Sequence, residues 1–404
     1  MSRRVTCTLL KALLLCALLG GEISLAGAQT KSTGAFQQLA NEAKQANEES
    51  RLDDAAKLYA RAVALRPQWE EGWWSLGTIQ YDQDKYADAA KSFSKVLAIH
   101  PQNGTAHAML GLCQYELGDD EIALKNLMAA EELGIVKDEQ LRKVAIFHLG
   151  LVQLRTKRFN TAKETFWQLA KDGLRTNDLI LALGQAALLV RPQDSPGPGT
   201  EGLRVLDRAG EAESLLASKD FENARKDYAE LVGQYPNFPN LHLAYGRFLL
   251  ELHENESAIA EFKKELARDP NNINVLLEIA AVQYQMDSQD GLKYAEQAVE
   301  LAPRIAFAHY LLGMLRLDTG DAAGAIPELE TARKGMPNEA KVYFALGNAY
   351  ARTGKKIEAV KARAEFARLN AIGAKKSNVT VHGEQASGVC SEELRTLDKE
   401  KPLP

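Results

Sequence analysis

A helical unit of about 34 residues recurs along this chain, and it limits the possible folds more than any other feature. The clearest copy covers residues 70–103. Trp73, Leu76 and Tyr81 lie at the spacing of one helix face, and Gly77 interrupts that face. Because a glycine inside a helix costs about 1 kcal/mol relative to alanine, we expect compensation from close packing of a second helix at Gly77.

The second half of the same unit has the pattern of another amphipathic helix. Ala89, Phe93 and Val96 give it an apolar stripe, and we expect Ala89 to be the small residue that faces Gly77. Pro101 ends the unit because proline cannot continue a helix. Each unit is therefore predicted to be a helix–turn–helix pair.

The spacing of these markers is kept along most of the chain. The small first-helix residues follow one another at 33 or 34 residues within two series, Gly77–Gly111 and Gly246–Ala280–Gly313–Gly347. The closing prolines of the second series keep step with them: Pro236, Pro270, Pro303 and Pro337. The small residues of the second helices are Ala55, Ala89, Ala123, Ala162, Ala224, Ala258, Ala325 and Ala359.

This pattern resembles the tetratricopeptide repeat family over roughly residues 36–370. The Leu-Gly pairs that end at Gly77, Gly111, Gly150, Gly313 and Gly347 carry much of the resemblance. It departs from the family in that the first-helix tryptophan occurs only at Trp73, and Tyr81 and Tyr115 come one residue late. The resemblance implies an all-α, right-handed superhelical solenoid whose first helices line a concave binding surface.

Residues 1–28 have the pattern of a secretory signal peptide. Basic residues precede an apolar run over residues 12–19, and Ala26-Gly27-Ala28 offers a small-residue cleavage site before Gln29. An uncleaved membrane anchor is the less favoured alternative because spanning a bilayer takes about 20 apolar residues. We therefore expect export to the periplasm or beyond, with a bacterial source inferred from general appearance.

The repeats fall into two predicted blocks, residues 29–176 and 205–370. Between them, residues 177–204 form a degenerate repeat with a Pro/Gly-rich loop at 191–200. Gly184 is only 28 residues before Ala212, so a second helix is missing there. An eroded repeat is favoured over a joint or an exposed edge covered by a partner. Residues 371–404 are predicted to be a disordered polar tail.

Net charge narrows the class of partner, and the cysteine content bears on disulfide formation. Loss of the leader would take the formal charge from −5 to about −7, which disfavours nucleic acid and anionic lipid. After cleavage, Cys113 and Cys390 remain. Cys113 falls in a predicted helix and Cys390 in the tail, so unpaired thiols are favoured over a disulfide between them.

When the repeats are aligned, mostly aromatic and apolar residues of the first helices fall on the predicted concave surface. This composition suits an extended peptide or a partner helix. The alternative is that several of them pack between neighbouring helices. In the first block these residues are Trp74, Tyr81, Met109, Leu112, Tyr115, Phe147, His148 and Leu151. In the second block they are Arg247, Tyr284, Phe307, Tyr310, Met314, Phe344 and Asn348.

No motif points to catalysis, a metal or a cofactor. His253-Glu254 lacks the second histidine of a zinc-protease helix, and Lys355 does not follow a phosphate-binding loop of the right length. We therefore predict an exported, non-catalytic scaffold for a protein or peptide partner. Two alternatives stay open: a structural envelope component held at a membrane by a partner, and, less favoured, an enzyme with a site near residues 191–200.

Overall fold

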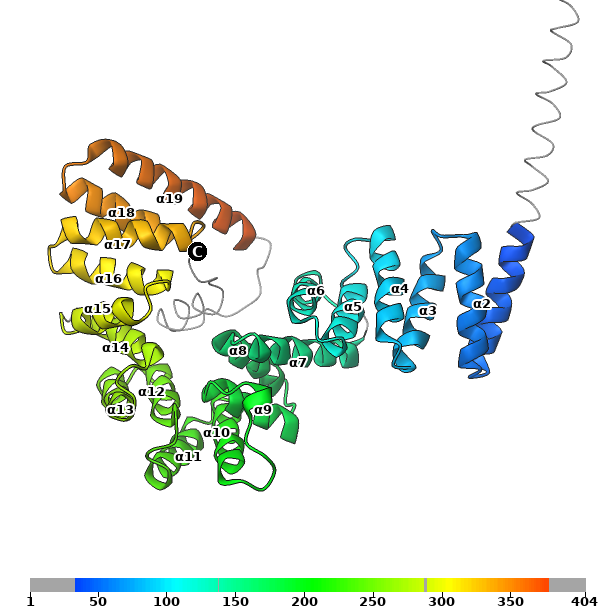
Figure 1. The fold of residues 1–404 in the computed structure, drawn as a ribbon, viewed down its shortest axis with the longest axis horizontal. Coiled ribbons are helices and arrows are strands. Elements are labelled where there is room, and N and C mark those ends of the chain that lie inside the picture. The colour runs from blue at the N-terminus through cyan, green and yellow to red at the C-terminus, as the bar shows by residue number, and fades with distance from the viewer. Residues whose placement is uncertain (1–32, 137, 287–288, 378–404) are drawn as a thin grey trace, which may run out of the picture. The chain divides into compact units, whose positions relative to one another are not determined.

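The structure is a computed structural model that describes residues 33–136, 138–286 and 289–377 (Figure 1). Within these residues it is helical, with no strand, which confirms the all-α prediction. A helix over residues 33–48 is followed by the second helix of the first repeat and by helices that alternate as first and second members of repeats. The elements up to the connector are α2 (Leu52–Leu65), α3 (Glu70–Asp82), α4 (Tyr86–Ile99), α5 (Gly104–Glu116), α6 (Asp120–Leu133), α7 (Glu139–Arg155), α8 (Phe159–Lys171) and α9 (Asn177–Ala187). The elements after it are the 3₁₀ helix η1 (Pro192–Asp194), α10 (Glu201–Ala217), α11 (Phe221–Gln234), α12 (Leu241–Glu251), α13 (Asn255–Arg268), α14 (Ile273–Gln285), α15 (Gly291–Leu301), α16 (Ala306–Asp318), α17 (Ala322–Gly335), α18 (Ala340–Arg352) and α19 (Lys356–Ser377).

The chain divides into two compact units, here called the N-terminal unit (residues 1–152) and the C-terminal unit (residues 153–404). The boundary falls inside α7, not at the predicted connector 177–204. The physical reason is that α9 packs closely on α10 and so joins the second unit. A Cβ on Gly184 would lie 1.9 Å from the Leu206 carbonyl oxygen, so the two helix backbones touch where no side chain intervenes.

Within ordinary repeats, the first-helix glycine receives a large side chain from the second helix. A Cβ on Gly77 would lie 3.0 Å from the Phe93 ring, and the equivalent position at Gly246 would meet Phe262 at 2.3 Å. The predicted close packing is therefore present. The nearest side chain is Phe93, four residues beyond Ala89, because the glycine leaves space that a ring fills. At Gly313 and Gly347 the alanines equivalent to Ala89, Ala325 and Ala359, also come within 4 Å through their carbonyl oxygens.

A hydrogen bond from each first helix back to the closing proline recurs in five repeats. The side chain six residues after the proline bonds its carbonyl oxygen, at 2.8–3.1 Å. The five pairs are Trp73–Pro67, His107–Pro101, His242–Pro236, His309–Pro303 and Tyr343–Pro337. This bond holds the turn between consecutive repeats, and it gives the histidines at this position a structural role.

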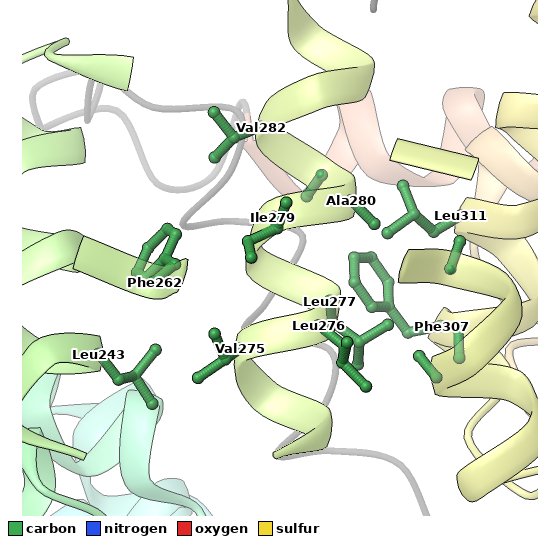
Figure 2. Close-up of a cluster of buried hydrophobic side chains, with 14 of the residues drawn as sticks. Leu243, Phe262, Val275, Leu276, Leu277, Ile279, Ala280, Val282, Phe307 and Leu311 are labelled. Atoms are coloured by element: carbon green, nitrogen blue, oxygen red, sulfur yellow. The ribbon is translucent and has the colours of Figure 1, made fainter. Parts of the chain in front are cut away.

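The C-terminal unit has a continuous core in which first helices are buried on several sides. In α14, nine consecutive residues from Val275 to Gln283 are buried. Figure 2 shows this helix between Leu243 and Phe262 on one side and Phe307 and Leu311 on the other. Burial on all sides is typical of a helix that packs against neighbours on several sides.

The predicted start of the C-terminal tail is wrong. The helix α19 continues to Ser377, so residues 371–377 are helical where a disordered tail was predicted. Alanine and lysine, which make up much of this stretch, are good helix formers. The predicted signal peptide, residues 378–404 of the predicted tail and Cys390 lie outside the described residues. None of the described helices is long and apolar enough to cross a membrane.

Candidate partner-binding surface

The residues predicted to contact a partner occupy equivalent places in successive first helices. Trp74, Phe147, Tyr310 and Phe344 each lie three residues before the small residue of their repeat. Three tyrosines lie four residues after it: Tyr81, Tyr115 and Tyr284. Equivalent places would be equally exposed in a uniform solenoid, so their actual exposure tests how alike the two units are.

In the N-terminal unit most of these side chains lie at the surface. Trp74, Tyr81, Tyr115, Phe147 and His148 are each half-buried, and we call these five residues the aromatic surface. Met109 and Leu112 are instead buried in the core beneath it, at 8% and 2% exposure. These two residues support the surface from below and cannot touch a partner unless the helices move.

The aromatic surface is held in place by ring contacts on its inner side. Trp74 packs edge-on against buried Phe93 with ring centroids 5.4 Å apart. Tyr115 packs edge-on against His148 at 4.8 Å, and the His148 Nδ1 lies 2.8 Å from the Val144 carbonyl oxygen. Each ring is therefore positioned by the fold while part of it stays open to solvent.

In the C-terminal unit the equivalent residues are largely core. Phe307 and Tyr310 are only 1% and 6% exposed, because α14 packs directly on α16 and α16 on α18. Leu243 and Leu277, at the place equivalent to Trp74, are fully buried. The prediction that Phe307 and Tyr310 offer a binding surface is therefore wrong for this structure, and the alternative that they pack between helices holds.

Of the other residues of the C-terminal unit that were predicted to bind a partner, one forms a buried ion pair and four are partly exposed. The Arg247 Nε lies 2.5 Å from Glu278 Oε1, and Glu278 is fully buried. Tyr284, Met314 and Asn348 are half-buried. Phe344 is 50% exposed and packs on Phe366 of the last helix at 5.3 Å. Of these predicted residues only Tyr284 in α14 and Phe344 in α18 are aromatic, and they lie two repeats apart.

An acidic row accompanies the aromatic surface, and sequence reasoning missed it. Glu48, Asp82 and Glu116 are the last residues of successive first helices, exactly one 34-residue period apart, and all are exposed. We call these three residues the acidic row. Burial raises the pKa of Tyr81 to about 12, with Glu116 and Asp82 adding to the rise. The tyrosine hydroxyl is thus a neutral donor beside a group of carboxylates.

Comparison with known proteins identifies the repeats. One tetratricopeptide repeat model matches residues 41–104, 74–132, 281–335 and 310–369, and a second matches residues 215–276. Together these matches cover more than half of the chain. This chain belongs to the tetratricopeptide repeat family. The predicted family is therefore confirmed.

Relatives of this tetratricopeptide repeat protein are distant. A cellulose synthase operon protein C from Xanthomonas axonopodis pv. citri is 26% identical over 250 residues, which is 59% of this chain and 15% of that protein. A crystal structure of MamA is 22% identical, with a TM-score of 0.38, over 41% of this chain and 96% of that one. A MamA fragment from Desulfovibrio magneticus RS-1 is 24% identical, also with a TM-score of 0.38, over 41% of this chain and 96% of that one.

The loop that interrupts the tetratricopeptide repeats shows no catalytic arrangement. Arg191 and Asp194 form an ion pair at 2.5 Å across it. The Ser195 hydroxyl is buried and has no hydrogen-bond partner in the described part of the chain, so no base is in place to activate it. Among the described residues, no group of three or more His, Cys, Asp or Glu side chains could hold a metal ion.

Proposed function

We propose that this chain is a non-catalytic scaffold that binds a peptide or partner protein on the aromatic surface of its N-terminal unit. One observation carries the proposal. At a single place in the repeat, Trp74 and Phe147 stay half-exposed, whereas Leu277 and Tyr310 are sealed by neighbouring helices. The N-terminal unit thus keeps this place open at Trp74 and Phe147, with a buried alanine, Ala108, between them. In the C-terminal unit the place is buried from α12 to α16 and opens at Phe344 of α18.

The chemistry of the aromatic surface suits protein recognition. Tryptophan and tyrosine supply a large contact area with little loss of side-chain freedom, and their polar tips can bond a partner backbone. Ring contacts already fix Trp74 and Tyr115, so little further ordering is needed on binding. Repeats of this family stack into extended surfaces of this kind.

We further propose that the scaffold works in the cell envelope after export. The support is the signal-peptide pattern of residues 1–28 and a relative named for a cellulose synthase operon. Cell fractionation with N-terminal sequencing tests this: a mature chain that begins at Gln29 in the periplasmic or secreted fraction is expected. A chain found only in the cytoplasm with residues 1–28 intact would contradict it, and tight membrane association after cleavage would favour an envelope component held by a partner.

The binding surface is tested by affinity capture with mass spectrometry from envelope extract of the source organism. The variant Trp74→Ser/Phe147→Ser is expected to lose the protein that the unaltered chain captures. Phe344→Ser is the matched control, since it removes an exposed ring at the same repeat place in the C-terminal unit. Capture that survives the double substitution while circular dichroism shows a folded chain would reject the aromatic surface. Substitution of Tyr310 is unsuitable because this buried side chain supports the core.

A further inference from the structure

We infer that the N-terminal unit recognises a basic, lysine- or arginine-bearing segment of its partner, docked along the paired rows of tyrosines and carboxylates at one end of its first helices. This inference rests on the proposed function and adds the chemistry of the partner. It starts from a repeat of two adjacent residues: Tyr81-Asp82 in α3 recurs as Tyr115-Glu116 in α5, 34 residues later. In the first helix the same places hold Asn47-Glu48.

The rings of these rows are supported by one buried cluster. Tyr81, Tyr86 and Tyr115 all pack against the same N-terminal core cluster, and Tyr81 meets Tyr86 edge-on with centroids 5.3 Å apart. All three are half-buried and keep an open part. Aromatic faces of this kind attract lysine and arginine side chains through cation–π contacts.

Asp82 and Glu116, the carboxylates beside these rings, are exposed and form no ion pair within the described part of the chain. Glu48 differs, because its charge helps to raise the pKa of Lys44 in the same helix. Asp84, in the turn after α3, accepts a hydrogen bond of 2.7 Å from the Tyr86 hydroxyl. The nearby Lys85 points its ammonium to Gln83 at 2.7 Å and to Asp53 at 4.0 Å, so it does not neutralise the row.

The helix ends add to the same negative potential. Helices α3 and α5 finish at Asp82 and Glu116, and neither has a basic residue in its last turn. A helix C-terminus carries about half a negative charge, which a lysine or arginine there would offset. In the C-terminal unit, α16 and α18 carry Arg316 and Arg352 in this turn, whereas α10, α12 and α14 carry no basic residue there. The N-terminal unit therefore presents uncompensated negative charge where its tyrosines are open, and the complementary partner is cationic.

The direct test uses three synthetic peptides of about 12 residues with the same leucine and tyrosine content, rich in arginine, in serine or in glutamate. Fluorescence anisotropy measures their binding to the full chain at about 50 and 300 mM NaCl, a range over which screening lengths fall markedly. We expect the arginine peptide to bind, its affinity to fall with salt, and the glutamate peptide not to bind. Equal binding of all three peptides, or none by the arginine peptide at low salt, would overturn the inference.

Site specificity is tested with two charge-matched double variants. Asp82→Asn/Glu116→Gln is expected to lower the affinity for the arginine peptide by about tenfold, as when charge pairs are removed from an interface. Glu121→Gln/Glu132→Gln removes the same charge from exposed places on the second helix α6 and is expected to change affinity by less than about twofold. Equal weakening by both variants would show non-specific attraction and reject the docking site.

The same variants separate this inference from the proposed function. If Trp74→Ser/Phe147→Ser abolishes capture of a partner and Asp82→Asn/Glu116→Gln does not, the scaffold stands and the basic-segment inference fails. If the captured partner is lost with both variants, and its contact region maps to a basic stretch by cross-linking, both stand. If the aromatic variant leaves capture intact, the proposed surface itself fails.

Discussion

The first helix α3 of the N-terminal unit and the first helix α14 of the C-terminal unit use one repeat in two ways. In α3 the buried residues are confined to Gly72, Leu76, Gly77 and Ile79, whereas α14 buries nine residues in succession. The sequences account for this. Outside its buried stripe, α3 carries polar residues such as Glu70 and Thr78, whereas the same places in α14 are Ile273 and Ala281. A narrower apolar stripe leaves a face for a ligand, and a wider one commits the helix to its neighbours.

Ion pairs between consecutive first helices show the same contrast. Lys44 and Arg247 occupy the same repeat place, one residue after the small residue, and each reaches an acid on the next first helix. The Lys44–Glu71 pair is 2.8 Å apart, with side chains 44% and 58% exposed. The Arg247–Glu278 pair has side chains 10% and 0% exposed, and Glu278 Oε2 lacks any hydrogen-bond partner in the described part of the chain.

The largest expected effect comes from removing these cations. Arg247→Met should destabilise the C-terminal unit by about 3–5 kcal/mol, because it leaves Glu278 buried without a counter-charge. Lys44→Met should cost the N-terminal unit less than about 1 kcal/mol, because water solvates the remaining Glu71. Urea denaturation, with hydrogen exchange to locate the loss, measures both. Equal costs would mean that the two units do not differ in how their first helices pack.

The sequence predicted the repeats well and their exposure poorly. Period, glycine positions and closing prolines follow from local helix chemistry, so Gly77 and Pro101 could be placed without a structure. Exposure of Tyr310 depends on how closely α16 meets α14 and α18, which is a long-range property. The acidic row could have been predicted, since Glu48, Asp82 and Glu116 keep the period. Charged residues at helix ends are common, however, and this row gains meaning only when the structure shows that the neighbouring rings are partly exposed.

Glycine packing gives a second contrast, between the α9–α10 pair and an ordinary repeat. A Cβ on Gly210 in the C-terminal unit would lie 1.8 Å from the Ile180 carbonyl oxygen, and backbone cannot move aside cheaply. A Cβ on Gly77 in the N-terminal unit would meet only the Phe93 ring at 3.0 Å, and a ring can shift. We expect Gly210→Ala to cost about 3 kcal/mol, and Gly77→Ala to cost about 1 kcal/mol or less because alanine favours the helix.

Thermal and urea denaturation of these two variants measures the difference. Gly233→Ala is the control, since a Cβ at this exposed place in α11 meets nothing within 4 Å. It should be neutral or stabilise by up to about 1 kcal/mol. A mild effect at Gly210 would show that α9 is not fastened to α10 by backbone contact, and would return the unit boundary to the connector.

Acid should weaken the C-terminal unit through a motif that the N-terminal unit carries in uncharged form. His309 Nδ1 lies 2.6 Å from Glu328 Oε2, whereas the equivalent His107 Nδ1 lies 2.9 Å from Asn126 Oδ1. The hydrogen bond from His309 lowers the pKa of Glu328, and Arg316 adds to this. Because the folded pKa lies below the unfolded value, this stabilisation is present above about pH 4.5 and is lost as pH falls through the folded pKa.

Hydrogen exchange, corrected for intrinsic rates, compares α16 and α17 with α5 and α6 between neutral and acidic pH. Glu328→Gln should cost about 1–2 kcal/mol at neutral pH, because charge-assisted hydrogen bonds are lost, and should reduce the acid sensitivity of α16 and α17. Helices α12 and α13 should stay acid-sensitive in this variant, because the pKa of Glu261 is also lowered, by bonds from His242 and Lys264 that outweigh its burial. Equal acid sensitivity in α5 and α6 would locate the effect elsewhere.

The smallest expected effect is on stability when the acidic row is neutralised. Asp82→Asn/Glu116→Gln should change the free energy of unfolding by no more than about 0.5 kcal/mol, because exposed carboxylates without an ion pair contribute little to folding. Any change should be toward greater stability at low salt, since the substitutions relieve repulsion and the unfavourable charge at two helix C-termini. Urea denaturation at two salt concentrations measures this. A clear loss of stability would show that the row supports the fold, which would remove the reason to assign it to a partner.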